Sequence, residues 1–63
     1  MEKLIGRLLP GDCVVLDDFE DGTRDIAVID ATFPIGDGAE YRVWLVGDKI
    51  PLRMGRYEML EVL

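Results

Sequence analysis

Few residues in this 63-residue sequence have side chains that can carry out covalent chemistry. The chain has one cysteine, Cys13, and no histidine. A cysteine nucleophile needs a base that generates its thiolate, and a Ser–His–Asp site needs an imidazole. Cys13 lies beside Val14 in a short apolar run, so we interpret it as a buried structural thiol. One cysteine without histidine also excludes an internal disulfide and a zinc site built from cysteine and histidine.

Carboxylates are the second candidate group, and they gather in the acidic segment that begins at Asp17. Read as an EF-hand loop, this segment places Gly22 correctly at position six, but Phe19 at position three and Val28 at position twelve do not coordinate calcium. We therefore expect no metal and no cofactor, with an irregular cation site as the minor alternative. The main interpretation is a solvated acidic loop, and the more specific alternative is a contact surface for a basic partner. The candidate partner-binding carboxylates are Asp17, Asp18, Glu20 and Asp21.

Trp44 and Arg42 form the other candidate surface, because they fall on the same face of an alternating segment. Tryptophan and arginine are enriched at the centres of protein interfaces. Trp44 either covers one end of the folded chain or lies exposed as an interface residue. Both faces of this segment carry large apolar residues, which suits a strand covered by the core on one side and by a partner on the other.

The composition limits the function classes further. Apolar residues make up 49% of the chain, and its net charge is −6, from 13 acidic and 7 basic residues. This length fits one domain with a small core, for which self-association is a common source of stability. The negative charge argues against binding to nucleic acid or to an anionic membrane. The sequence has neither a membrane-spanning apolar run nor a signal-peptide pattern, so we expect a cytoplasmic protein.

The elements that must position these residues are short strands. Short apolar runs bounded by turn signals predict strands over residues 13–16, 25–32 and 59–63, and alternating apolar residues predict strands over 40–46 and 49–54. Gly47-Asp48 predicts a two-residue hairpin joint, and Pro51 makes the second arm of this hairpin an edge strand. Pro34 marks the end of a strand or an edge. Residues 1–9 have helical apolar spacing and predict a lid on the core, with a short edge strand as the alternative.

The order of these features resembles that of SH3-like small β-barrels of the KOW and Tudor class. The resemblance covers residues 10–63 and rests on the strand order and on the segment Pro-Gly-Asp-Cys-Val-Val-Leu that begins at Pro10. It implies a mainly β, five-stranded barrel within one domain of residues 1–63, with residues 1–9 as a helical or turn segment. A barrel of this size fills its interior with side chains, so we expect no active site within one chain.

The expected function is therefore a non-catalytic protein-interaction or regulatory module. Its acidic surface would recognise a basic partner. One alternative is a nucleic-acid-binding barrel that uses its basic and aromatic residues. The other is a homo-oligomer that has a small-molecule site at the interface between its subunits. Any catalysis would also take place at that interface.

Overall fold

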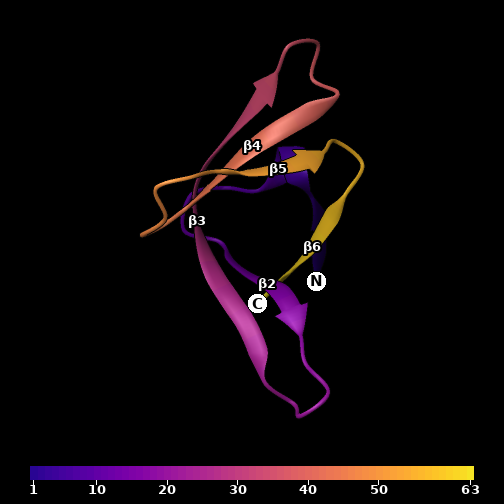
Figure 1. The fold of residues 1–63 in the computed structure, drawn as a ribbon. Helices are drawn as coiled ribbons and strands as arrows, with labels where there is room; N and C mark the ends of the chain where they lie inside the picture. The colour runs from indigo at the N-terminus through magenta and orange to yellow at the C-terminus, as the bar shows by residue number, and fades with distance from the viewer.

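The strands of the computed structural model form one antiparallel sheet, and the only helical element is a single 3₁₀ turn (Figure 1). All residues from 1 to 63 are described. The strands are β1 (Glu2–Leu4), β2 (Cys13–Asp18), β3 (Arg24–Ile35), β4 (Glu40–Leu45), β5 (Leu52–Gly55) and β6 (Met59–Val62), and the turn is η1 (Ile5–Arg7). Their order in the sheet is β1-β6-β2-β3-β4-β5. The mainly β class is confirmed, whereas the sheet is open and has β1 and β5 at its edges.

The long strand β3 connects the two halves of the sheet. It pairs with β2 up to Val28 and with β4 from Ile29 onward, so it changes partners near its middle. β3 continues through Pro34, which pairs with β4 on one side and has no strand on the other. The predicted edge position of this proline is therefore confirmed. The predicted two-residue joint between β4 and β5 is wrong, because residues 46–51 connect these strands.

The N-terminal segment is part of the core rather than only a lid on it. Residues 2–4 form the edge strand β1, which pairs with β6, and helical geometry is limited to the three residues of η1. Ile5 and Leu8 are both buried in the core. Gly6 lies so close to Tyr41 that a Cβ atom at this position would be 2.9 Å from the tyrosine oxygen. The expected helical segment is therefore mostly replaced by the edge strand that was its alternative.

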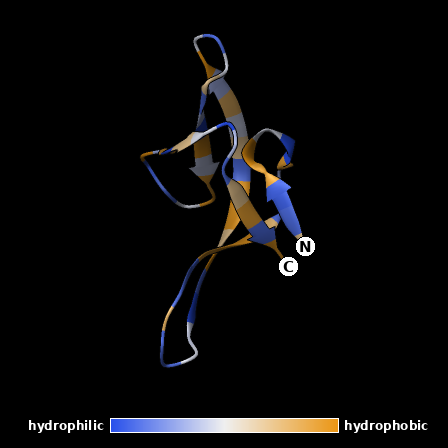
Figure 2. Cartoon of the chain, turned by 90° about the vertical axis from the view of Figure 1, so that its right-hand side faces the viewer, coloured by the Kyte–Doolittle hydropathy of each residue, from blue (hydrophilic) through white to orange (hydrophobic).

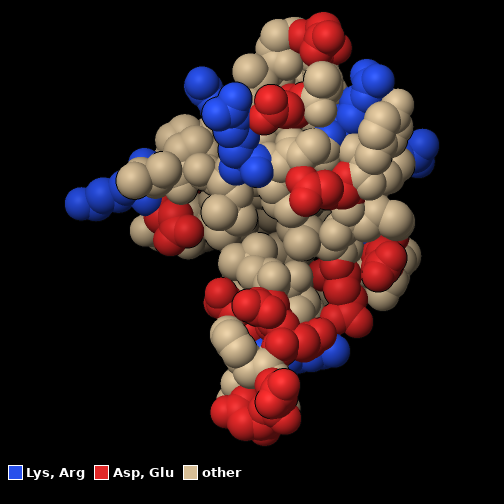
Figure 3. Space-filling view, turned by 45° about the vertical axis from the view of Figure 1, so that its right-hand side comes forward, with Lys and Arg blue, Asp and Glu red and all other residues tan.

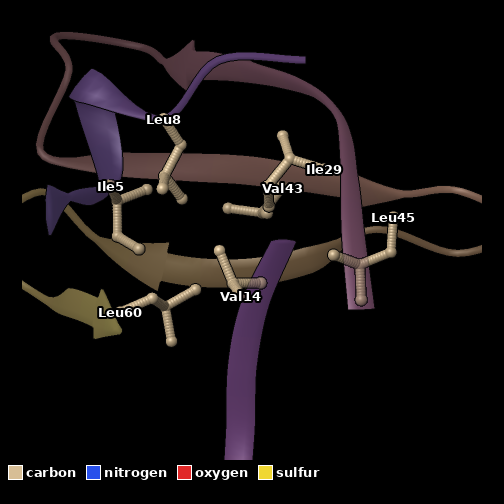
Figure 4. Packing of buried hydrophobic residues seen from close by; sticks show 7 residues of the cluster. All are labelled: Ile5, Leu8, Val14, Ile29, Val43, Leu45 and Leu60. Atoms are coloured by element: carbon tan, nitrogen blue, oxygen red, sulfur yellow. The ribbon is translucent and has the colours of Figure 1, made fainter. Parts of the chain in front are cut away.

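Seven buried side chains form the core, and they come from η1 and the residue after it and from β2, β3, β4 and β6 (Figure 4). They are Ile5, Leu8, Val14, Ile29, Val43, Leu45 and Leu60. Bands of hydrophobic and hydrophilic residues follow one another along the chain in Figure 2. Strict alternation, which the pleat favours when one face is covered, holds in β5 and in the first four residues of β4. Only eight residues are buried in all, while twelve large hydrophobic side chains are exposed. The fold thus leaves much apolar surface in contact with water.

Asp12 fixes the turn that leads into β2. Its carboxylate accepts a hydrogen bond from the Leu9 N–H at 2.9 Å and another from Lys3 Nζ at 3.3 Å. The hydrogen bond from Leu9 lowers the pKa of Asp12, and the bond and charge of Lys3 act in the same direction against partial desolvation. Asp12 therefore ties β1 to the start of β2.

Candidate functional site

The acidic segment forms the end of the β2–β3 hairpin, which projects away from the rest of the sheet (Figure 1). Asp17 pairs with Asp25 and Asp18 with Arg24, so these residues belong to strands, and the loop is only residues 19–23. The Phe19 N–H donates to the Thr23 carbonyl at 2.9 Å, and the Gly22 N–H donates to the Phe19 carbonyl at 3.0 Å. Gly22 has a φ of 87°, which favours glycine at this position of the turn. The expected long loop is therefore a longer hairpin with a short tip.

Asp21 stabilises this tip. Its Oδ1 atom accepts hydrogen bonds from the Thr23 hydroxyl at 2.6 Å and from the Thr23 N–H at 3.0 Å. The bond from the hydroxyl is the main reason that the pKa of Asp21 is lowered, and the bond from the N–H adds to it. Asp21 is therefore ionised and oriented at neutral pH.

Arg24 links the hairpin to the C-terminal strand. Its Nε atom lies 2.8 Å from Asp18 Oδ1, and its Nη1 atom lies 3.3 Å from Glu61 Oε2. No ion pair involves Asp17 or Glu20, and both side chains are exposed. These two carboxylates are thus free to contact another molecule.

Sheet pairing adds carboxylates that are distant in the sequence. Glu2 on β1 lies opposite Glu61 on β6, and Glu61 lies opposite Val15 on β2. We call the resulting surface the acidic end, and Figure 3 shows its carboxylates gathered on the lower part of the molecule. The acidic end comprises Glu2, Asp17, Asp18, Glu20, Asp21, Asp25 and Glu61. No group of three or more His, Cys, Asp or Glu side chains is arranged to hold a metal ion.

Trp44 and Arg42 lie elsewhere, on the outer face of β4. Trp44 is opposite Ala31, while Arg42 is opposite Phe33 on one side and Arg53 on the other. Trp44 is half-buried and does not belong to the core cluster, whereas Arg42 and Phe33 are exposed. The six candidate residues therefore fall on two separate surfaces, with four at the acidic end and two on β4.

The structure also has a groove that the sequence reasoning missed. It lies where β4 separates from β3, has a volume of about 480 Å³, and is bordered by Asp25 and Asp48. Ile26, Val28 and Val46 contribute exposed apolar surface to it. The available signal was the run of apolar residues from Ile26 to Ile29, which supplies apolar side chains to both faces of a strand. The groove itself requires the change of partner in β3, which no local pattern indicates.

Comparisons of this chain with protein-family models, with curated proteins and with solved structures found no match. Among its elements, no helix has the length and apolar character needed to cross a membrane. Charge, exposure and strand geometry are therefore the observations from which its function is inferred.

Proposed function

We propose that this chain is a non-catalytic protein-interaction module that binds a basic partner through its acidic end. The observation that carries this proposal is the concentration of carboxylates at one end of the sheet. Residues 17–25 hold five carboxylates and one arginine, and Glu2 and Glu61 lie beside them. All four basic residues of the second half, Arg42, Lys49, Arg53 and Arg56, lie on β4, β5 and their connections. Four carboxylates on the same segments balance their charge, namely Asp37, Glu40, Asp48 and Glu58.

The acidic end is arranged at some cost to the fold. Asp17 lies directly opposite Asp25, and Glu2 directly opposite Glu61. Like charges at directly opposed positions of an antiparallel pair destabilise it. A concentrated negative field also attracts a basic partner and raises the rate of encounter. Partner attraction is the benefit that offsets this repulsion in our proposal.

We further infer that the fold is a variant of the SH3-like small barrel. The support is the strand order, in which β2 to β5 follow one another and β6 returns to pair with β2. A one-turn connection joins β5 to β6, and there the Glu58 N–H donates to the Gly55 carbonyl at 3.0 Å. In this proposal residues 10–63 are the barrel-like unit and β1 is an addition to its edge. The fold leaves the ligand open, so the charge distribution argues for the partner.

A second candidate function is a subunit of a homo-oligomer with a site at the shared interface. The observation that favours it is the number of exposed large hydrophobic side chains, twelve in a chain of 63 residues. Small domains often complete their burial by association. The outer face of β4, with Trp44 and the exposed Phe33, would then lie at this interface.

Titration with decalysine, followed by calorimetry at low and at physiological salt, tests the proposed function. The test variant is Asp17→Asn with Glu20→Gln, because neither carboxylate makes an ion pair. The matched control is Asp30→Asn with Asp37→Asn, which changes the net charge equally away from the acidic end. We expect the test variant to bind about fivefold more weakly and the control to bind as the wild type does.

Equal weakening in both variants would contradict the proposal, because it would assign the attraction to net charge alone. Absence of binding at low salt would contradict it as well.

A further inference from the structure

β3 has an unpaired edge beside the acidic end. From Arg24 to Val28 it pairs only with β2, and its pairing with β4 begins at Ile29. The Val46 N–H still donates to the Val28 carbonyl at 2.9 Å, and the chain then turns at Gly47, which has a φ of 90°. Figure 1 shows the lower half of β3 with β2 on one side and no strand on the other. The edge is therefore open where β4 turns away.

The backbone groups of Ile26 point to this open edge. Successive residues of a strand direct their N–H and C=O groups to alternate sides. Ile29 bonds on the β2 side, since its N–H donates to the Asp12 carbonyl at 2.9 Å, whereas the Val28 carbonyl bonds on the β4 side. Ile26 has the same orientation as Val28, so its donor and its acceptor face the position that an added strand would occupy.

The groove at this edge has the surface that an added strand needs. Exposed fractions of 49% for Ile26, 37% for Val28 and 62% for Val46 leave apolar area for the side chains of such a strand. Asp25 and Asp48 border the same groove and place two carboxylates beside it. Apolar contacts at one set of alternate positions and cations at the other would complement this surface.

We propose that this edge binds an extended segment of a basic partner protein, which adds to β3 as an antiparallel strand in line with β4. Its apolar side chains pack on Ile26, Val28 and Val46, and its Lys or Arg side chains meet Asp25 and Asp48. This inference rests on the proposed function and specifies the form that the basic partner takes. Charge favours this occupant over a second copy, because the same edge of another copy would bring identical carboxylates to Asp25 and Asp48 in a chain of net charge −6.

The test is a titration with the blocked peptide Val-Lys-Val-Arg-Val-Lys-Val, monitored by amide NMR. A second peptide has the same sequence with its three central amides N-methylated, which removes the donors from both edges and keeps the charge. We expect the methylated peptide to bind about tenfold more weakly. The Ile26 amide should show the largest shift with the unmodified peptide.

Ile26→Pro tests the same edge from the protein side, with Ile26→Val as its matched control. Proline removes the N–H that faces away from β2, so the ladder between β2 and β3 is retained. We expect Ile26→Pro to lower the affinity for the unmodified peptide about tenfold and Ile26→Val to leave this affinity unchanged. If the proline variant does not fold, the comparison of the two peptides on the wild type still decides whether the peptide adds to β3 as a strand.

Two results would overturn strand addition while leaving the proposed function in place. One is equal binding of both peptides with continued dependence on Asp17 and Glu20. The other is a wild-type dimer that Ile26→Pro dissociates, which would assign the edge to a second copy. Failure of both peptides and of decalysine to bind would overturn the inference and the proposed function together.

Discussion

Asp12 shows at the residue scale how one carboxylate connects segments that are adjacent in space. It binds the Leu9 N–H and Lys3 Nζ, and its pKa is lowered from the ordinary value of 3.8. Because the pKa of Asp12 is lower in the folded state than the ordinary 3.8, its stabilisation is complete above pH 3.8. This stabilisation is lost as the pH falls through the lowered pKa of the folded state. We therefore expect the melting temperature of the wild type to fall as the pH is reduced below about 4.

Melting curves of Asp12→Asn between pH 7 and pH 2 isolate this contribution. The variant should melt at a lower temperature at pH 7 and show a weaker dependence on pH below 4, because it has no charge at this position. Asp30→Asn is the control, since Asp30 is a surface aspartate that makes no ion pair. A profile of Asp12→Asn parallel to that of the wild type would contradict this assignment.

Residue patterns predicted some of these local features and missed others. An Asp-Gly pair favours a tight turn through local chemistry, and Asp21-Gly22 lies at the tip of the hairpin. The interaction of Arg24 with Glu61 was not predictable, because it joins residues on strands that pair only in the folded sheet. The half-buried position of Trp44 likewise depends on the neighbours that β3 supplies.

At the element scale, the segment formed by β1 and η1 is the strongest test of how the core is built. Ile5 is fully buried in the cluster, so Ile5→Ala removes core volume and should cost about 2–4 kcal/mol in the free energy of unfolding. Leu9→Ala is the matched control, because Leu9 is 61% exposed and its truncation should cost less than about 0.5 kcal/mol. Urea denaturation measures the free energy of unfolding of both variants. Equal stability of the two variants would show that the segment is only a lid.

Approximate strand positions were predictable from apolar runs and turn signals, whereas their pairing was not. The expected strands agree within one residue with β4 and β6. They end two residues too early for β2 and three too early for β3, and the expected strand over 49–54 begins three residues before β5. The register shifts between Val15 and Asp17 and between Ile29 and Ala31 place an extra residue in one strand, which bends that strand locally, and no residue type marks them. The connection of residues 46–51 differs from the predicted two-residue joint because β5 begins after Pro51.

At the scale of the whole molecule, the sequence predicted that charge is uneven but not how far the unevenness extends. The first 32 residues hold eight of the 13 acidic residues. Glu61, near the C-terminus, joins the acidic end only because β6 pairs with β1 and β2. The open edge of β3 is also a property of the whole sheet, since it exists where β4 turns away.

The most direct test of the central claim is affinity capture from the cells that produce this protein, with captured proteins identified by mass spectrometry. The experiment compares three proteins. They are the wild type, a control variant that carries both Asp30→Asn and Asp37→Asn, and an acidic-end variant that carries both Asp17→Asn and Glu20→Gln. The account predicts a partner with a basic surface that the first two retain and that the acidic-end variant loses. A partner that all three retain equally, or one with an acidic surface, would contradict it.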